Sequence, residues 1–331
     1  MGCRSFSRRG AGRTDRLELL VTGGLKPEGR SRERLRASLR VLDVVTGRLV
    51  RSAWLDDVEA EPLGSHRETT VACLGTDGRL LVPSRAAVYE VDPARLTGTR
   101  VFYHPRAADI HSICPRTAGG FWITATAADA VLGVDERWAV QDTWELATRE
   151  ELPDDLRGRP YASLKPHRVH PNFAWDDGQH AWATCFEGSH ARSRHGRCVQ
   201  FAEGQPHDGV LRDGLRWFTL VTGYVLGVQP ETLEVVERYD LGALSGTKRL
   251  LGWCRGIEVV GDRIYVGMTQ LRSTTHREVL RWMALGEAGR KAPTRVLEIQ
   301  RGRRPKILRE FPVGNRAGGT IHGLLALTPG G

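Results

Sequence analysis

The stretch TVACLGTDGRLLVPSRAAVYEVD (Thr70–Asp92) decides the fold of this chain. Short apolar runs are separated by the turn sequence G-T-D-G and by a second brief gap, and the last run ends in an acidic residue. Apolar runs of this length, bounded by Gly and Asp, are typical of β-strands joined by tight turns. We therefore expect consecutive antiparallel strands here and no helix.

The same pattern recurs along the chain, and further copies begin near residues 111, 170, 207 and 255. Several copies carry a D-G, D-D-G or G-D turn between their first two strands. A fourth strand is expected at Arg48–Leu55, Gln141–Leu146 and Val235–Leu241. Four antiparallel strands in units of roughly 40 to 60 residues are typical of β-propeller blades.

The two ends of the chain complete the count of blades. Residues Leu17–Leu55 supply most of one further blade, and Ile321–Leu327 resembles an innermost strand with no blade after it. If the C-terminal strand pairs with the N-terminal blade, the ring closes without an unpaired edge. The sequence thus predicts an all-β, six-bladed β-propeller in one domain over residues 17–331, preceded by a disordered basic tail over residues 1–16.

Other arrangements stay open at this point. Five or seven blades are possible, because the copy at residue 170 lacks a clear outer strand and the copy at 255 has a long insertion, Gln270–Thr294. Two separate all-β domains are a competing arrangement. An α/β fold needs helices between its strands, and the only helical candidates are Ser31–Arg36 and Thr275–Leu285.

Composition excludes several classes of protein. No apolar run reaches the roughly 18 to 20 residues of a membrane-spanning helix, so we expect no membrane partner. The net charge is +9, but 43 of the 48 basic residues are scattered arginines without a nucleic-acid motif, so we expect no nucleic-acid partner. The six cysteines form no C-x-x-C pair and no signal peptide is evident, which favours the cytoplasm.

Aligning the repeats by their first strand reveals a candidate metal site. The residue that opens this strand is a histidine in four repeats: His111, His170, His207 and His322. The fifth repeat has Arg255 there, and the remaining one has Glu68 or Thr69. The innermost strands of a propeller line its central channel, so equivalent positions converge. Four imidazoles at one point would suit a transition metal, with Fe(II) or Zn(II) favoured.

Neighbouring residues suggest catalytic roles beside the metal. Arg255 would bind an anionic group of a small-molecule substrate, or form a salt bridge to Glu68 across the channel. Glu68 would act as a general base or hold a ligand in place. Asp208 would orient a ring nitrogen of His207, or would be only a turn residue. His167 is expected on the opposite face of an extended segment from His170, outside the site.

The repeats resemble the six-bladed propellers of the NHL and gluconolactonase-like superfamily over most of residues 17–331. At the centre, His111, His170, His207 and His322 resemble the four histidines that hold iron in the longer, seven-bladed carotenoid cleavage oxygenases. The inner-strand histidines beside Arg255 also resemble the zinc site of the peptidyl-hydroxyglycine amidating lyases. Both resemblances imply a bound transition metal.

Together these patterns predict a metal-dependent enzyme of lyase, isomerase or oxygenase type that acts on a small, anionic metabolite in the central channel. The alternative is a non-catalytic binding propeller. In that case the histidine ring would be structural, and a protein partner would dock on the rim.

Overall fold

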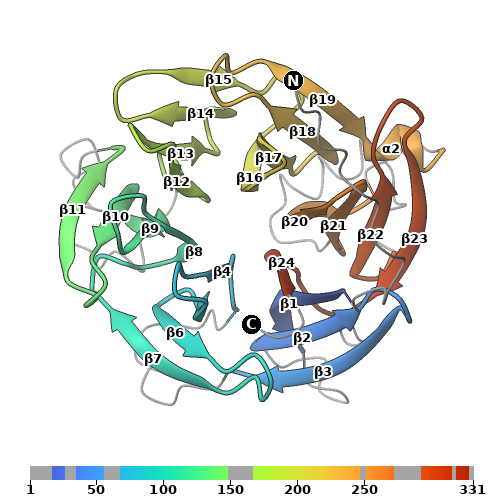
Figure 1. The fold of residues 1–331 in the computed structure, drawn as a ribbon, viewed down its shortest axis with the longest axis horizontal. Coiled ribbons are helices and arrows are strands. Elements are labelled where there is room, and N and C mark those ends of the chain that lie inside the picture. The colour runs from blue at the N-terminus through green and yellow to red at the C-terminus, as the bar shows by residue number, and fades with distance from the viewer. Residues whose placement is uncertain are drawn as a thin grey trace, which may run out of the picture.

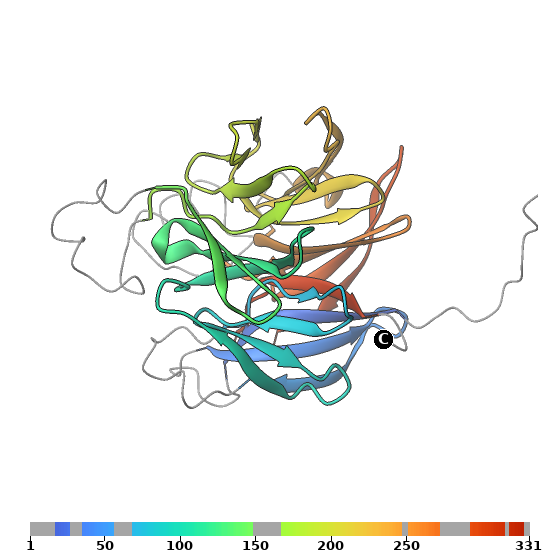
Figure 2. The ribbon, with the colours of Figure 1, turned by 60° about the vertical axis from the view of Figure 1, so that its left-hand side comes forward.

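The computed structural model describes residues 17–26, 35–55, 68–147, 167–246, 251–271, 292–314 and 318–327. The predicted tail over residues 1–16 lies outside these ranges. The described chain forms six four-stranded antiparallel sheets arranged as a ring, as Figure 1 shows in face view and Figure 2 from the side. The all-β, six-bladed propeller predicted from the repeats is therefore confirmed, and the five-bladed and seven-bladed arrangements are wrong.

Each sheet is one blade whose strands run from the centre of the ring outward. The first two blades consist of β24 (Gly323–Leu327), β1 (Glu18–Leu25), β2 (Arg36–Asp43) and β3 (Arg48–Trp54), and of β4 (Cys73–Leu74), β5 (Leu80–Pro83), β6 (Ala87–Val91) and β7 (Gly98–Tyr103). The next two consist of β8 (Ile110–Pro115), β9 (Phe121–Ala125), β10 (Ala130–Val134) and β11 (Val140–Glu145), and of β12 (Ala174–Asp176), β13 (Ala181–Cys185), β14 (His190–Ser193) and β15 (Cys198–Gln200). The last two consist of β16 (Pro206–Arg212), β17 (Leu215–Leu220), β18 (Tyr224–Val228) and β19 (Val235–Asp240), and of β20 (Trp253–Val260), β21 (Arg263–Thr269), β22 (Arg295–Gln300) and β23 (Lys306–Pro312).

The ring closes as the sequence predicts. Strand β24 pairs antiparallel with β1, from Thr22 opposite Gly323 to Glu18 opposite Leu327. The C-terminal strand thereby becomes the innermost strand of the N-terminal blade, which leaves no free inner edge at the seam.

Two expectations about individual elements need correction. The blade that begins near residue 170 does have an outer strand, β15, which pairs with β14; its three residues are too few to stand out in the sequence. The helical candidate Ser31–Arg36 is wrong at its end, because Arg36 begins strand β2. The helical candidate Thr275–Leu285 lies outside the described residues. Within those residues, helix is confined to the single turns η2 (Thr126–Ala128) and α2 (Leu241–Leu244), and no helix is long and apolar enough to cross a membrane.

Turn chemistry and burial explain why these residues form blades. Asp213 and Gly214, between β16 and β17, both have positive φ angles (51° and 73°), as a two-residue hairpin turn requires. Middle strands such as β17 are buried along their whole length, whereas the outermost strands are largely exposed. Blades pack face to face through large side chains, for example Trp175 and Trp182 against Phe218 of the next blade. A repeat cannot bury both faces of its sheet alone, so neighbouring blades supply the core.

Candidate functional site

The innermost strands of three blades are irregular where the sequence places candidate site residues. Register shifts interrupt the pairing of β8, β16 and β20 with their neighbouring strands. The interrupted intervals contain His111, His207 and Arg255, respectively. A bulge breaks the strict alternation of side chains and redirects a residue that would otherwise follow its strand. The bulges thus allow these three side chains to point in directions that regular alternation along the strand would not give them.

Threonines of the second strand accept hydrogen bonds from backbone N–H groups near the start of the innermost strand. In the third blade, the Thr124 hydroxyl oxygen accepts hydrogen bonds from the backbone N–H groups of His111 (3.1 Å) and Ser112 (2.9 Å). In the fourth blade, the Thr184 hydroxyl accepts from Asn172 (3.2 Å) and Phe173 (3.0 Å) in the same way. Since a buried unpaired N–H is costly, each threonine stabilises the turn into the inner strand.

Three of the four predicted histidines approach one another. The ring centroids of His111 and His207 are 5.7 Å apart, those of His207 and His322 are 6.1 Å apart, and those of His111 and His322 are 6.4 Å apart. His170 lies 5.2 Å from His111, and it also contacts Phe186 and His167. We call His111, His207, His322, Glu68, Arg85 and Arg255 the central site.

Five imidazole nitrogens of the central site have no hydrogen-bond partner within the described part of the chain. They are Nδ1 of His111 and both ring nitrogens of His207 and of His322, and all five are buried. Burial lowers the pKa of His111 and His322 to about 4, and lowers that of His207 well below its usual range. All three rings are therefore neutral at pH 7, and each ring keeps one nitrogen whose lone pair can bind a metal or accept a proton, while its other nitrogen carries a hydrogen.

A buried ion-pair network lies against these rings. Arg85 pairs with Asp109 and, through Nη2, with Glu68 at 3.3 Å. Its Nη1 donates to Nε2 of His111 at 3.0 Å. The carboxylate of Glu68 also accepts a 2.6 Å hydrogen bond from the Thr320 hydroxyl.

Glu68 remains ionised although it is buried. Burial alone would raise the pKa of Glu68, but His322 and Arg85 beside it hold that pKa well below its usual range. Its Oε1 lies 3.4 Å from Nε2 of His322. That separation is within ion-pair distance, but the hydrogen-bond geometry is not met. Glu68 therefore lies beside His322 without being bonded to it, in a position to exchange a proton with this ring.

Asp208 and Arg255 are connected through the backbone. The two carboxylate oxygens of Asp208 accept hydrogen bonds from the Thr219 hydroxyl and from the N–H of Gly256. Burial raises the pKa of Asp208 to about 8. Asp208 thus bonds to neighbouring strands and not to a nitrogen of His207, and it lies in strand β16, not in a turn.

The guanidinium of Arg255 stacks 4.2 Å above the ring of Trp253. After burial, the positive charge of Arg255 is the next cause that lowers the pKa of His207. This charge therefore lies near the central histidines, as the repeat alignment predicts. The sequence analysis gave a salt bridge between Arg255 and Glu68 as an alternative, but the ion pair that Glu68 forms is with Arg85.

One expectation about the site is wrong and three contributors are new. His167 is not on the far side of His170: their Nδ1 atoms lie 2.9 Å apart, because His170 has a positive φ of 56° and the chain bends there. Arg85, Asp109 and Thr320 were not anticipated. Asp109 stands two residues before His111, which is the one local signal that could have drawn attention to it.

The rings approach but do not yet form a coordination sphere. Within the described ranges, no group of three or more His, Cys, Asp or Glu side chains is arranged to hold a metal ion. Imidazoles that share one metal at about 2.1 Å would have ring centroids about 5 Å apart. The central rings, at 5.7 to 6.4 Å, are slightly wider than that.

Comparison with known proteins shows the fold and not the activity. No family model matches the chain, and no curated protein matches it. Among solved structures, a protein of unknown function from Bacteroides caccae is similar with a TM-score of 0.58 and 14% identity, over 94% of this chain and 99% of that chain. A streptogramin B lyase is similar with a TM-score of 0.52 and 11% identity, over 92% of this chain and 86% of that one.

A third similar structure, from Bacteroides uniformis, is described as a candidate 6-phosphogluconolactonase. It has a TM-score of 0.50 and 10% identity, over 91% of this chain and 84% of that one. The neighbours of this propeller thus include proteins named as a lyase and as a lactonase. At these identities the likeness extends to the fold alone. The resemblance of the histidines to those of carotenoid oxygenases and amidating lyases stays a prediction.

Proposed function

We propose that the centre of this propeller is the active site of a metal-dependent enzyme of lyase, isomerase or oxygenase type, which acts on a small anionic metabolite. The observation that carries the proposal is the set of five buried, neutral imidazole nitrogens without described hydrogen-bond partners on His111, His207 and His322. Buried polar atoms are rarely left unpaired, and an ion that binds there is one of the standard explanations.

The donor set fits a transition metal. His207 and His322 would ligate it first, because all their ring nitrogens are unpaired. His111 would join once Arg85, which already pairs with Glu68 and Asp109, releases its Nε2. Neutral imidazoles suit Fe(II) and Zn(II) and do not suit Ca²⁺ or Mg²⁺. His170, which contacts only His111 of these rings, would be an outer ligand or would border the substrate. The bound metal would supply Lewis-acid chemistry or an oxygen-binding centre.

The residues around the metal would handle substrate and protons. Arg255, held flat against Trp253, would bind the anionic group of the substrate. Glu68, ionised and next to His322, would move protons. Asp208 would act indirectly, since its carboxyl holds the N–H of Gly256 and so positions the neighbouring Arg255.

Metal analysis of protein purified without a histidine tag tests this proposal. We expect about one equivalent of iron or zinc per chain, and loss of most of it in His207→Ala. His195→Ala is the matched control, because His195 is an exposed histidine whose ring contacts that of His180 and lies outside the central site. We also expect the wild-type chain, and not His207→Ala, to be stabilised by about 3 kcal/mol when the metal is present at 100 times its Kd.

Two outcomes would contradict the proposal. Less than about 0.3 equivalents of any transition metal, unchanged in His207→Ala, would favour the binding propeller with structural histidines. Equal metal content in wild type, His207→Ala and His195→Ala would place any bound metal elsewhere.

A further inference from the structure

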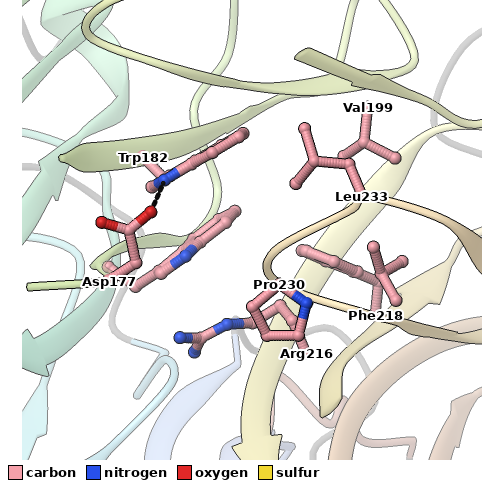
Figure 3. Close-up of a pocket in the computed structure, with 9 residues that line it drawn as sticks. Asp177, Trp182, Val199, Arg216, Phe218, Pro230 and Leu233 are labelled. Atoms are coloured by element: carbon pink, nitrogen blue, oxygen red, sulfur yellow. Dashed lines mark hydrogen bonds between the residues drawn. The ribbon is translucent and has the colours of Figure 1, made fainter. Parts of the chain in front are cut away.

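A cleft between the fourth and fifth blades leaves no room for a ligand. Figure 3 shows it with Trp182, Phe218 and Arg216 among its lining residues. Its interior has room for about one water molecule, about 20 Å³. The rings of Trp182 and Phe218 already pack against Trp175, and Arg216 covers Trp175 at 5.0 Å. Arg216 has neither a hydrogen bond nor an ion pair within the described residues. The cleft is therefore part of the packing between blades.

Two carboxylates lie beside imidazoles at the centre of the ring, at nearly the same distance. Oδ1 of Asp109 is 3.5 Å from Nε2 of His111, and Oε1 of Glu68 is 3.4 Å from Nε2 of His322. A cation joins the first pair, because Nη1 of Arg85 contacts both the carboxylate of Asp109 and Nε2 of His111. Within the described chain, no cation joins the second pair in this way, since Arg85 contacts Glu68 only, at Oε2. The second pair thus has the spacing of the first without the cation.

The separation of Glu68 and His322 suits two ligands of one metal ion. Zinc binds imidazole nitrogens and carboxylate oxygens at about 2.1 Å, so two such ligands at a tetrahedral angle lie about 3.4 Å apart. Oε1 of Glu68 and Nε2 of His322 have this separation, although the geometry of a hydrogen bond between them is not met. Two ligands of one metal point at the ion and not at each other, which accounts for both observations.

Neighbouring groups hold the carboxylate of Glu68 in place. The buried hydroxyl of Thr320 donates to Oε1 at 2.6 Å, and Arg85 pairs with Oε2 at 3.3 Å. Carboxylates that bind metals are themselves hydrogen-bonded in this way, and the bonds fix their orientation. Glu68 can therefore bind an ion through Oε1 while Oε2 stays with Arg85.

We propose that Glu68 is a metal ligand: Oε1 of Glu68 and Nε2 of His322 bind the same ion, and His207 is the third ligand. Both ring nitrogens of His207 lack a described partner, and its ring centroid is 6.1 Å from that of His322. The inference rests on the proposed function and specifies its ligands as two histidines and one carboxylate. Such three-ligand sites leave a position open for water or substrate. Oε2, which does not bind the ion, would be the oxygen through which Glu68 exchanges a proton.

Zinc is the probe, and competition with a chelator of known affinity measures its binding. Glu68→Gln keeps the size of the side chain but removes the ligating carboxylate, so it should weaken zinc binding at least about 100-fold. Glu258→Gln is the matched control. Glu258 is also a buried glutamate paired with an arginine, Arg212 at 2.8 Å, but its other contact is the N–H of Ala326 and not a central histidine. This control should leave zinc affinity unchanged.

Anomalous diffraction from wild-type crystals grown with zinc is the second readout, and it needs no variant to fold. We expect zinc within about 2.3 Å of both Oε1 of Glu68 and Nε2 of His322. Zinc that binds His207 and His322 but lies more than about 3 Å from Oε1 would overturn this inference and leave the proposed function standing. Equal zinc affinity in wild type and Glu68→Gln, or equal losses in Glu68→Gln and Glu258→Gln, would do the same. A wild-type chain that binds neither zinc nor Fe(II) at about 1 mM would overturn both.

Discussion

Arg85 donates a hydrogen bond from Nη1 to Nε2 of His111 at 3.0 Å, although the two residues belong to different blades. An arginine cannot accept a hydrogen bond, so Nε2 of His111 must carry its lone pair toward Arg85. The neutral ring then bears its proton on Nδ1, the nitrogen that has no described partner. The same guanidinium neutralises Glu68 and Asp109, so this one side chain sets the charge state of the central site.

Removing the positive charge of Arg85 should destabilise the protein strongly. In Arg85→Met the carboxylates of Glu68 and Asp109 stay buried without their counter-charge, and we expect a loss of about 3 to 5 kcal/mol in the free energy of unfolding. Urea unfolding at pH 7 measures this. Arg106→Met breaks the surface pair with Glu145 and should cost less than about 1 kcal/mol. Similar losses in both variants would mean that the network around Arg85 is not buried in the way described.

The neutral histidines should make the fold sensitive to acid. The pKa of His322 is lowered to about 4 by burial, so the unfolded chain binds this proton first and stability falls as the pH drops below about 6.5. Between pH 7 and pH 5 this imidazole should account for about 2 kcal/mol of lost stability. His322→Gln should reduce that slope in urea unfolding across the pH range, and His195→Gln, at an exposed position, should not. An unchanged slope in His322→Gln would show that this ring is already charged in the fold.

The contribution of Asp208 to stability should depend on pH in the opposite direction to that of His322. Burial raises its pKa to about 8, so its contribution is present below about pH 4 and is lost as the pH rises toward 8. Asp208→Asn imitates the protonated carboxyl, which can keep its bonds to Thr219 and Gly256. Relative to wild type, this variant should gain up to about 5 kcal/mol between pH 4 and pH 8. A variant that is less stable than wild type by the same amount at every pH would show that Asp208 is ionised in the fold.

Two buried arginines should respond differently to the same substitution. Arg40 donates to the backbone carbonyls of Val313 and Thr320, at 2.6 and 2.7 Å. Arg40→Met leaves both carbonyls unpaired and should cost about 2 to 4 kcal/mol. Arg216→Met removes a buried charge that has no described partner, so it should be neutral or stabilising by about 1 to 3 kcal/mol. Thermal and urea unfolding compare the two; a large loss in Arg216→Met would show that its stack on Trp175 is structural.

Local sequence chemistry was sufficient to predict the architecture. The Asp213-Gly214 turn predicts a hairpin, and the apolar runs beside it predict the two strands that this hairpin joins. The spare strand at the C-terminus predicts that the ring closes on the N-terminal blade. All three features are present. These features depend on residues close in the chain, or on a repeat that copies them. The short outer strand β15 was missed because three residues carry too little pattern.

The candidate site was predicted less completely. The repeat alignment singled out the histidines and Arg255, since equivalent positions of a repeated unit come to equivalent places, and the rings of His111, His207 and His322 do approach one another. It could not find Arg85 or Thr320, which lie outside the aligned position and reach the site from a turn and from the chain before β24. It also misplaced His167, because a positive φ at His170 breaks the alternation that an extended chain would have.

The sequence by itself determined that this chain is a closed, six-bladed all-β ring, because strand period, turn residues and repeat spacing are local properties. Only the tertiary structure decided which atoms meet there. Glu68 and Thr320 are 252 residues apart in the chain and share a hydrogen bond. Such contacts depend on how bulged strands from different blades pack, and no local pattern encodes that packing. The unpaired Arg216 likewise emerged only from the packing of the fourth blade against the fifth.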